Sequence, residues 1–118
     1  MKCMSTIEMH LQEPIFNYIK YGTKRFELRL LDEKRKNVKI GDEIVFINRN
    51  NDNDRIKTRV IGLLFYSNFS ELVSDLDIRL MMDESMTKGE LINELNKFYP
   101  AEEQKELGVV GIRFELES

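Results

Sequence analysis

The sequence predicts an α+β protein in which a small mixed β-barrel is closed at its ends by helices. Segments with the two-residue alternation of strands outnumber segments with helical spacing, so a sheet builds most of the core. The helical segments fall between strands without the regular alternation of a doubly wound sheet, which excludes that architecture. The chain has 118 residues, of which 42% are hydrophobic, and this is enough for one domain with its own core.

Five segments have the pattern of strands. In the first, apolar residues alternate with polar ones, and the last, Val110 to Leu116, repeats this alternation. The segment from Arg55 to about Ser67 is longer than an ordinary strand, and Gly62 marks a bulge or bend within it. We expect strands at residues 7–11, 26–30, 43–48, 55–67 and 110–116.

The expected helices lie between these strands. Pro14 suits the first turn of a helix that Gly22 ends, because glycine adopts the left-handed conformation without a Cβ clash. Thr87 and Glu90 form a capping box ahead of a helix whose buried face includes Phe98. Shorter helices or turns are expected at residues 32–37, 69–76 and 101–107, and residues 48–54 are expected to form a mobile hairpin tip with no binding role.

Composition excludes several classes of protein. No apolar run approaches the ~20 residues of a membrane span, and the N-terminus does not have the pattern of a signal peptide, so a cytoplasmic protein is expected. The lone Cys3 has no partner for an internal disulfide. One cysteine and one histidine, His10, cannot supply the three or four ligands of a zinc site. We expect neither a metal nor a cofactor.

The charges are unevenly distributed along the chain. The net charge of -3 argues against a protein that coats nucleic acid without specificity. Residues 1–60 hold 13 basic against 9 acidic side chains, a balance of +4, whereas residues 61–118 hold 5 against 12, a balance of -7. Arg55, Lys57 and Arg59 alternate along one strand. These three side chains either follow a phosphate backbone or protect an edge strand, and the sequence leaves both interpretations open.

The clearest functional signal is the stretch from Gly22 to Arg29. Lys24, Glu27 and Arg29 stand at the opening of an otherwise apolar strand, where a plain core strand carries no charge. Alternation from Phe26 onward places Glu27 and Arg29 on the same face. In a regular strand Lys24 would point to the same apolar face as Phe26, so it lies beside Glu27 and Arg29 only if the strand starts irregularly. We expect the three side chains to meet in one pocket at the mouth of the barrel.

At these residues the chain resembles the ASCH domain family (activating-signal-cointegrator homology), a branch of the PUA-like β-barrels. The family signature Gly-x-Lys-x-x-Glu-x-Arg is filled by Gly22, Lys24, Glu27 and Arg29. Gly41-Asp42 ahead of a hydrophobic strand and Tyr99-Pro100 after a helix are also similar to the family pattern. The resemblance runs from about Ile7 to Leu116, and it implies a single ASCH domain over residues 1–118 with a PUA-like β-barrel fold.

The resemblance also implies binding of RNA or nucleotides. A cation beside a carboxylate can hold a nucleotide from two sides, with Lys or Arg on a phosphate and Glu on an exocyclic amine. Tyr21 or Tyr99 would offer a surface on which a base stacks. The leading hypothesis is a cleft that recognises single-stranded RNA or a modified nucleoside. Its ligand-binding residues would be Gly22, Lys24, Glu27, Arg29 and Tyr99.

Two alternatives remain open. Small bacterial relatives resemble amidohydrolases that deacetylate N4-acetylcytidine with a Lys, a Thr three residues later and a Glu ahead of the last long helix. In such an enzyme the catalytic residues of this chain would be Lys24, Glu27 and Glu84. Glu27 stands where those relatives have Thr, and a carboxylate can activate water but cannot replace a hydroxyl nucleophile. A protein-binding accessory domain is the third interpretation, and it requires a large exposed apolar patch.

Overall fold

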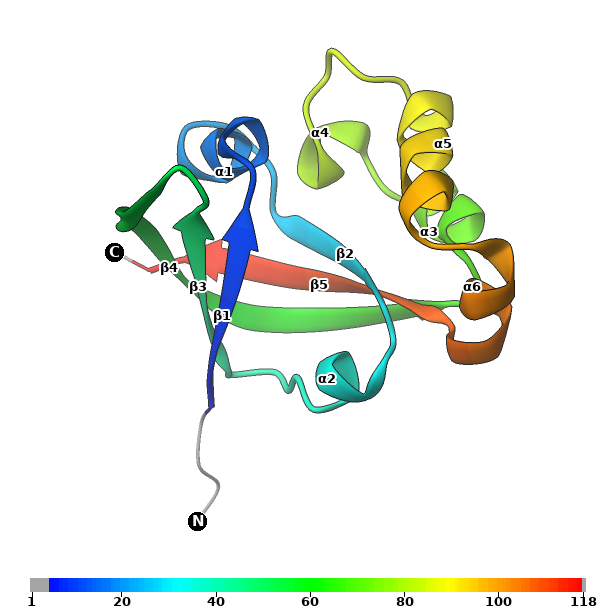
Figure 1. Cartoon of the computed structure of the whole chain (residues 1–118), viewed down its shortest axis with the longest axis horizontal. Coiled ribbons are helices and arrows are strands. Elements are labelled where there is room, and N and C mark those ends of the chain that lie inside the picture. Colours follow the sequence, from blue (N-terminus) through cyan, green and yellow to red (C-terminus); the bar gives the residue numbers. More distant parts are fainter. Residues whose placement is uncertain (1–4, 118) are drawn as a thin grey trace.

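Five strands form one mixed sheet that curls into a half-barrel (Figure 1). The computed structural model describes residues 5–117, and Cys3 lies outside this range. The strands are β1 Thr6–Leu11, β2 Phe26–Leu30, β3 Glu43–Asn48, β4 Asn51–Tyr66 and β5 Val109–Leu116. Their order is β1-β3-β4-β5-β2, with β1 parallel to β3 and every other pair antiparallel. The sheet therefore has β1 and β2 as its edges, and the predicted mixed α+β barrel is confirmed.

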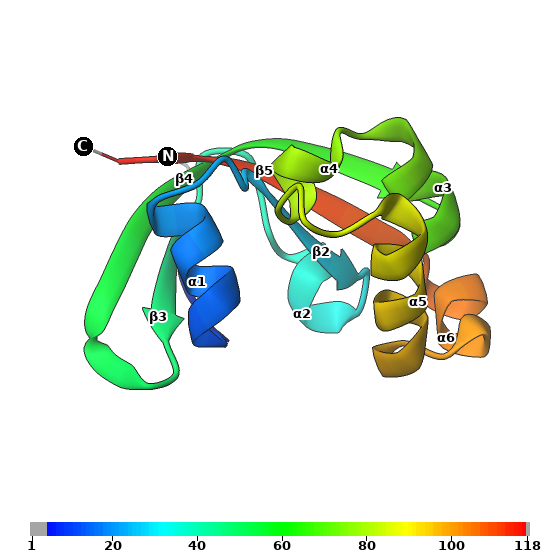
Figure 2. The same cartoon turned by 90° about the horizontal axis from the view of Figure 1, so that it is seen from above.

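Six helices of the described chain surround this sheet. They are α1 Glu13–Lys20, α2 Glu33–Lys36, α3 Phe69–Asp75, α4 Ile78–Met81, α5 Lys88–Phe98 and α6 Ala101–Leu107. Figure 2 shows α1 beside β3, while α5 and α6 lie side by side at the opposite end. Within residues 5–117, no helix combines the length and the apolar character that crossing a membrane requires.

The first part of the long strand β4 pairs with β3, and the second part pairs with β5. The pairing with β3 runs from Asn51 to Arg59 and that with β5 from Thr58 to Tyr66. The register with β5 shifts between Val60 and Gly62, which confirms the predicted bulge. The strand begins earlier than expected, because Asn51 already pairs with Asn48 across the hairpin. The segment predicted to be a mobile tip is therefore mostly strand.

Two of the three basic residues of β4, Arg55 and Arg59, contact carboxylates of the fold. Arg55 contacts Glu8 of β1 at 3.2 Å, and Arg59 contacts Glu117 at 2.7 Å. Because β4 pairs with both β3 and β5 at Thr58 and Arg59, the edge-protection interpretation is wrong for Arg59. The part of β4 that pairs with β3 alone lies before Thr58.

Two hydrophobic clusters lie on opposite faces of β5. One contains Phe16 of α1 together with Phe46 and Phe114, whose ring centroids are 5.0 Å apart. The other contains Val109 of β5 and Phe69 of α3. Successive residues of a strand point to opposite faces, so β5 contributes to both clusters. The first cluster fixes α1, and the second fixes α3 to α5 beside β2.

Gly22, at the join between α1 and β2, is needed for a close contact between backbone segments. We expected a left-handed residue there, but the glycines with positive φ in the described chain are Gly41 and Gly108. At Gly22 an added Cβ would lie 2.6 Å from the carbonyl oxygen of Tyr18. The helix does end next to Gly22, as predicted, but the predicted reason is wrong. Glycine is required because a side chain would collide with the Tyr18 carbonyl, and not because the backbone has a positive φ.

The variant Gly22→Ala tests this contact. We expect the free energy of unfolding to fall by about 1–3 kcal/mol, because the Cβ has no room beside a backbone oxygen. The matched control is Gly89→Ala in α5, where the nearest atom to an added Cβ, Thr87 Oγ1, is 3.9 Å away. That control should be neutral or more stable by about 0.5–1 kcal/mol. Urea denaturation measures both variants, and equal stability of the two would contradict the contact.

Candidate functional site

A cavity of about 570 Å³ opens beside β2 and is lined by residues of α1, α4 and α5. Figure 1 shows α1 on one side of β2 and α4 and α5 on the other. We call this cavity the β2 cavity. Its polar and aromatic lining includes His10, Lys24, Glu27, Arg29, Arg49, Asp83, Phe98 and Tyr99. The cavity lies where the half-barrel is open, so the unpaired edge of β2 forms part of its wall.

The chain entering β2 is tied to helices before it reaches the sheet. The amide of Lys24 donates to the Tyr18 carbonyl at 3.2 Å, and the amide of Arg25 donates to the Leu80 carbonyl at 2.7 Å. Regular pairing with β5 begins only at Phe26. This is the irregular start that Lys24 requires if it is to lie on the same side as Glu27.

Lys24 joins the free edge of β2 to α4. The amide of Phe114 in β5 donates to the Arg25 carbonyl, so the next carbonyl, that of Phe26, points toward the open edge. Lys24 Nζ donates to this carbonyl at 2.6 Å and to the Met81 carbonyl at 2.5 Å. The lysine is only 2% exposed. Two buried carbonyls thus take two of the three ammonium protons.

Glu27 stands between two cations. Its Oε1 lies 3.8 Å from Lys24 Nζ and accepts a hydrogen bond from the Leu28 amide at 3.2 Å. Its Oε2 lies 3.4 Å from a terminal nitrogen of Arg29. Glu27 is buried as well, although its alternation places it on the face predicted to be polar. A carboxylate is tolerated there because both cations and a backbone amide compensate for its lost hydration.

The electrostatics of the three charges follow from burial and proximity. Burial lowers the pKa of Lys24, and the positive charge of Arg29 adds to this, while the Glu27 carboxylate opposes it. The same carboxylate raises the pKa of Arg29. The Glu27 carboxylate offsets one of the two positive charges and two carbonyls engage Lys24, so this cluster is better suited to hydrogen bonding than to binding phosphate.

Arg29 extends from the cluster to Tyr99. A terminal nitrogen of Arg29 donates to the Tyr99 hydroxyl at 3.3 Å, and the Tyr99 ring packs against Phe69 at a centroid distance of 5.2 Å. Within residues 5–117 the Nε of Arg29 is buried and has no hydrogen-bond partner. A buried donor without a partner is costly, whereas each terminal nitrogen of Arg29 keeps one N–H beyond its contact with Glu27 or Tyr99.

The structure brings together four of the predicted site residues and separates two. Lys24, Glu27, Arg29 and Tyr99 line the β2 cavity. Gly22 and Glu84 instead line a different hollow of about 450 Å³, which Tyr21 also borders. Tyr21 is therefore not placed to stack on a base in the β2 cavity. The acidic residue that does reach this cavity from the same loop is Asp83.

Arg49 and Phe98 are among the lining residues that sequence reasoning missed. Arg49 lies in the hairpin segment to which we assigned no binding role, and it lines the cavity. Phe98 was expected on the buried face of its helix, but it is 76% exposed at the cavity edge. Burial falls along α5 from Leu91 at 2% exposure to Phe98, because the last turn of the helix extends beyond the core. Helical spacing alone could not reveal this.

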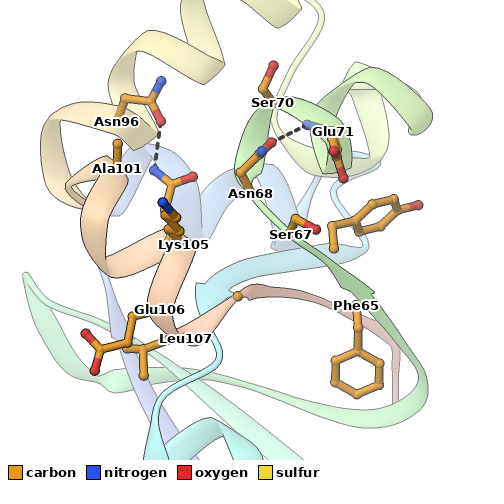
Figure 3. A pocket seen from close by; sticks show the side chains of 13 residues that line it. Phe65, Ser67, Asn68, Ser70, Glu71, Asn96, Ala101, Lys105, Glu106 and Leu107 are labelled. Carbon is orange, nitrogen blue, oxygen red and sulfur yellow. Dashed lines mark hydrogen bonds between the residues drawn. The ribbon is translucent and has the colours of Figure 1, made fainter.

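A larger groove of about 910 Å³ lies between the end of β4, α3 and α6 (Figure 3). Its amide side chains are used within the fold. Asn68 caps α3 by accepting from the Glu71 amide at 2.9 Å, and Gln104 donates to Asn96 at 2.9 Å. Gln104 also accepts from the Phe69 amide at 2.9 Å. These groups hold helices in place, so the groove is a weaker candidate than the β2 cavity.

Metal ligands do not cluster in the described chain. Within residues 5–117, no three side chains of the His, Cys, Asp and Glu types are grouped so that they could hold an ion.

Comparison with known proteins assigns a family and a fold. The family model of the ASCH domain matches residues 9–118. The crystal structure of hypothetical protein PH0355 is 35% identical, with a TM-score of 0.82, over 95% of this chain and 99% of that one. The solution structure of protein PF0455 from Pyrococcus furiosus is 33% identical, with a TM-score of 0.75, over 94% of this chain and 96% of that one. Comparison with curated proteins gave no significant match.

The variant Lys24→Met tests whether the buried ammonium holds β2 to α4. We expect a loss of roughly 3 kcal/mol or more in the free energy of unfolding, because two buried carbonyls lose their donor and Glu27 loses a cation. The control is Lys97→Met, which breaks an exposed ion pair with Glu94 at 3.1 Å. It should cost less than about 0.5 kcal/mol. Similar small losses in both variants would contradict this role of Lys24.

Proposed function

This chain belongs to the ASCH domain family, and we propose that its β2 cavity binds one base of a nucleotide or of a single-stranded RNA segment. The observation that carries the proposal is the Glu27–Arg29 pair on the cavity wall. A carboxylate accepts a hydrogen bond from an exocyclic amine, and a guanidinium donates to a ring nitrogen or a carbonyl. The two side chains therefore offer an acceptor and a donor side by side.

The hydrogen-bonding capacity left at this pair suits a base that carries an amine next to an acceptor. Oε2 of Glu27 makes only a 3.4 Å contact with Arg29, so it retains capacity to accept. Each terminal nitrogen of Arg29 keeps one N–H beyond its contact with Glu27 or Tyr99, and the hydroxyl proton of Tyr99 also remains as a donor. Cytosine presents an amine followed by two acceptors, and adenine an amine followed by a ring nitrogen, so both match the order acceptor, donor, donor of Glu27, Arg29 and Tyr99. Uracil instead presents its N–H between two carbonyls, which does not match this order. We therefore infer a preference for cytosine or adenine over uracil.

The size and rim of the cavity also suit a base. Small-molecule sites commonly have volumes of about 300–1,000 Å³, and the β2 cavity has about 570 Å³. Phe98 stands at its edge with most of its ring exposed. An exposed aromatic ring is a stacking surface for a base, and stacking contributes about 1–3 kcal/mol per base.

Binding is a better reading of the site than deacetylation. Glu84 borders a different hollow, so the Lys–Glu–Glu set of the hydrolase interpretation is not assembled around the β2 cavity. Lys24 is already engaged by two carbonyls. We expect N4-acetylcytidine incubated with the protein to remain intact when followed by chromatography. Release of cytidine that Lys24→Ala abolishes would replace the binding proposal with the enzymatic one.

Calorimetric titration with CMP, AMP and UMP tests the base-binding proposal. We expect CMP or AMP to bind more tightly than UMP, and Glu27→Gln to weaken that binding by about 10- to 100-fold, because a hydrogen bond to a charged group is worth about 1.5–3 kcal/mol. Glu71→Gln, in the groove at α3, is the matched control. Unchanged affinity in Glu27→Gln would contradict the proposed contact.

A second variant avoids any effect of Glu27 on folding. Phe98 is exposed, so Phe98→Ala should leave the unfolding midpoint unchanged while weakening nucleotide binding at least fivefold. Phe65→Ala is the control, since Phe65 is also exposed, at 60%, but lines the other groove. Equal binding by both variants would exclude stacking on Phe98.

A further inference from the structure

We infer that Arg49, with His10 beside it, forms a phosphate subsite at the mouth of the β2 cavity, so that the ligand is a nucleotide or an RNA strand and not a free nucleoside. The inference rests on the base-binding role proposed above and adds a second point of attachment. It starts from the charges inside the cavity. Lys24 and Arg29 share Glu27, and Lys24 is engaged by carbonyls, so neither cation is free for a phosphate.

Arg49 differs from the other arginines of the described chain. Within residues 5–117 its guanidinium makes no hydrogen bond or ion pair, although it lines the cavity. The other arginines have partners in the fold: Arg25, Arg29, Arg35, Arg55, Arg59 and Arg79 make hydrogen bonds or ion pairs, and Arg113 lies over the ring of Phe26. Arg49 is the guanidinium left for an external anion, and guanidinium groups bind phosphate well.

The backbone under Arg49 is held in place. Its amide donates to the Leu11 carbonyl at the end of β1, at 2.9 Å. The preceding residue, Asn48, is buried, and its side-chain amide contacts Glu13 at 3.2 Å and Asp54 at 3.4 Å. The hairpin is tied again to α1 by Lys20 and Asp54 at 2.7 Å. Because the backbone at Arg49 is already held in place, only its side chain must be ordered when a phosphate binds, which lowers the entropy cost of binding.

His10 reaches the same mouth from the neighbouring strand. In the parallel pairing of β1 with β3, His10 lies opposite Ile47 and Leu11 opposite Asn48, so both strands end at the same side of the cavity. His10 is exposed and can donate to a phosphate oxygen in its neutral form as well as its protonated form.

Among the described residues, the opposite wall of the cavity carries carboxylates and no arginine of the β3–β4 hairpin. Asp83, which follows α4, and Glu94 of α5 line this wall, and Glu94 also pairs with Lys97 at 3.1 Å. Charge therefore differs across the cavity, with Arg49 and His10 on the β1–β3 side and carboxylates on the other. A nucleotide whose base contacts Glu27 and Arg29 would be oriented with its phosphate toward Arg49.

The test compares cytidine with 5′-CMP by titration calorimetry, for the unmodified protein and for Arg49→Gln. We expect the unmodified protein to bind 5′-CMP roughly tenfold more tightly than cytidine. Arg49→Gln should remove this gain, reduce the salt dependence of 5′-CMP binding and leave cytidine affinity unchanged. His10→Gln should remove part of the gain. Arg55→Gln, which changes an exposed arginine outside the cavity, should retain all of it.

Three outcomes separate the two proposals. Equal affinity for cytidine and 5′-CMP, or a gain that survives Arg49→Gln, would overturn the phosphate subsite while base binding stands. Absence of binding by either ligand would overturn base binding itself, and the subsite with it. A parallel titration with the trinucleotide CpCpC distinguishes the sources of the phosphate: an Arg49-dependent gain there indicates an RNA strand, and a gain confined to 5′-CMP indicates a free nucleotide.

Discussion

The buried ammonium of Lys24 is the contact on which the geometry of this site depends. Its bonds to the carbonyls of Phe26 and Met81 join an edge strand to a helix far away in the sequence. Without a donor there, the free edge of β2 would present an unpaired carbonyl to a nonpolar interior, which is costly. The lysine also places a positive charge beside Glu27, so a carboxylate can be kept in the cavity wall. One side chain thus fixes both the shape of the cavity and its hydrogen-bonding character.

The cavity itself is a consequence of the strand order. With β1 and β2 at the two edges, the half-barrel is open between them, and the helices line this opening without filling it. The α1 side is held by the first hydrophobic cluster and the α4–α5 side by the second. A ligand in the opening would contact both halves of the fold. Its base would meet charges on β2, and its phosphate would meet Arg49 at the end of β3.

Local sequence signals predicted much of this fold, and non-local contacts account for the rest. Strand alternation and the signature around Lys24 identified β2 and three cavity residues, because those signals lie within a few positions of one another. Arg49 could not be found this way, since only the parallel pairing of β1 with β3 brings a polar hairpin to the cavity. Phe98 has the helical spacing of a core residue, but it is exposed because the last turn of α5 extends beyond the core. Spacing also could not decide whether Asp83 or Glu84 turns toward the cavity.

Binding of a nucleotide at the open edge of β2 can be measured directly. Titration of ¹⁵N-labelled protein with CMP, followed through backbone amide shifts, locates the ligand without relying on any variant. The account predicts the largest changes at Leu28, Arg29 and Arg49, with further changes near Phe98. Changes concentrated instead at residues 67–71 of the other groove, or no saturable change at all, would contradict it.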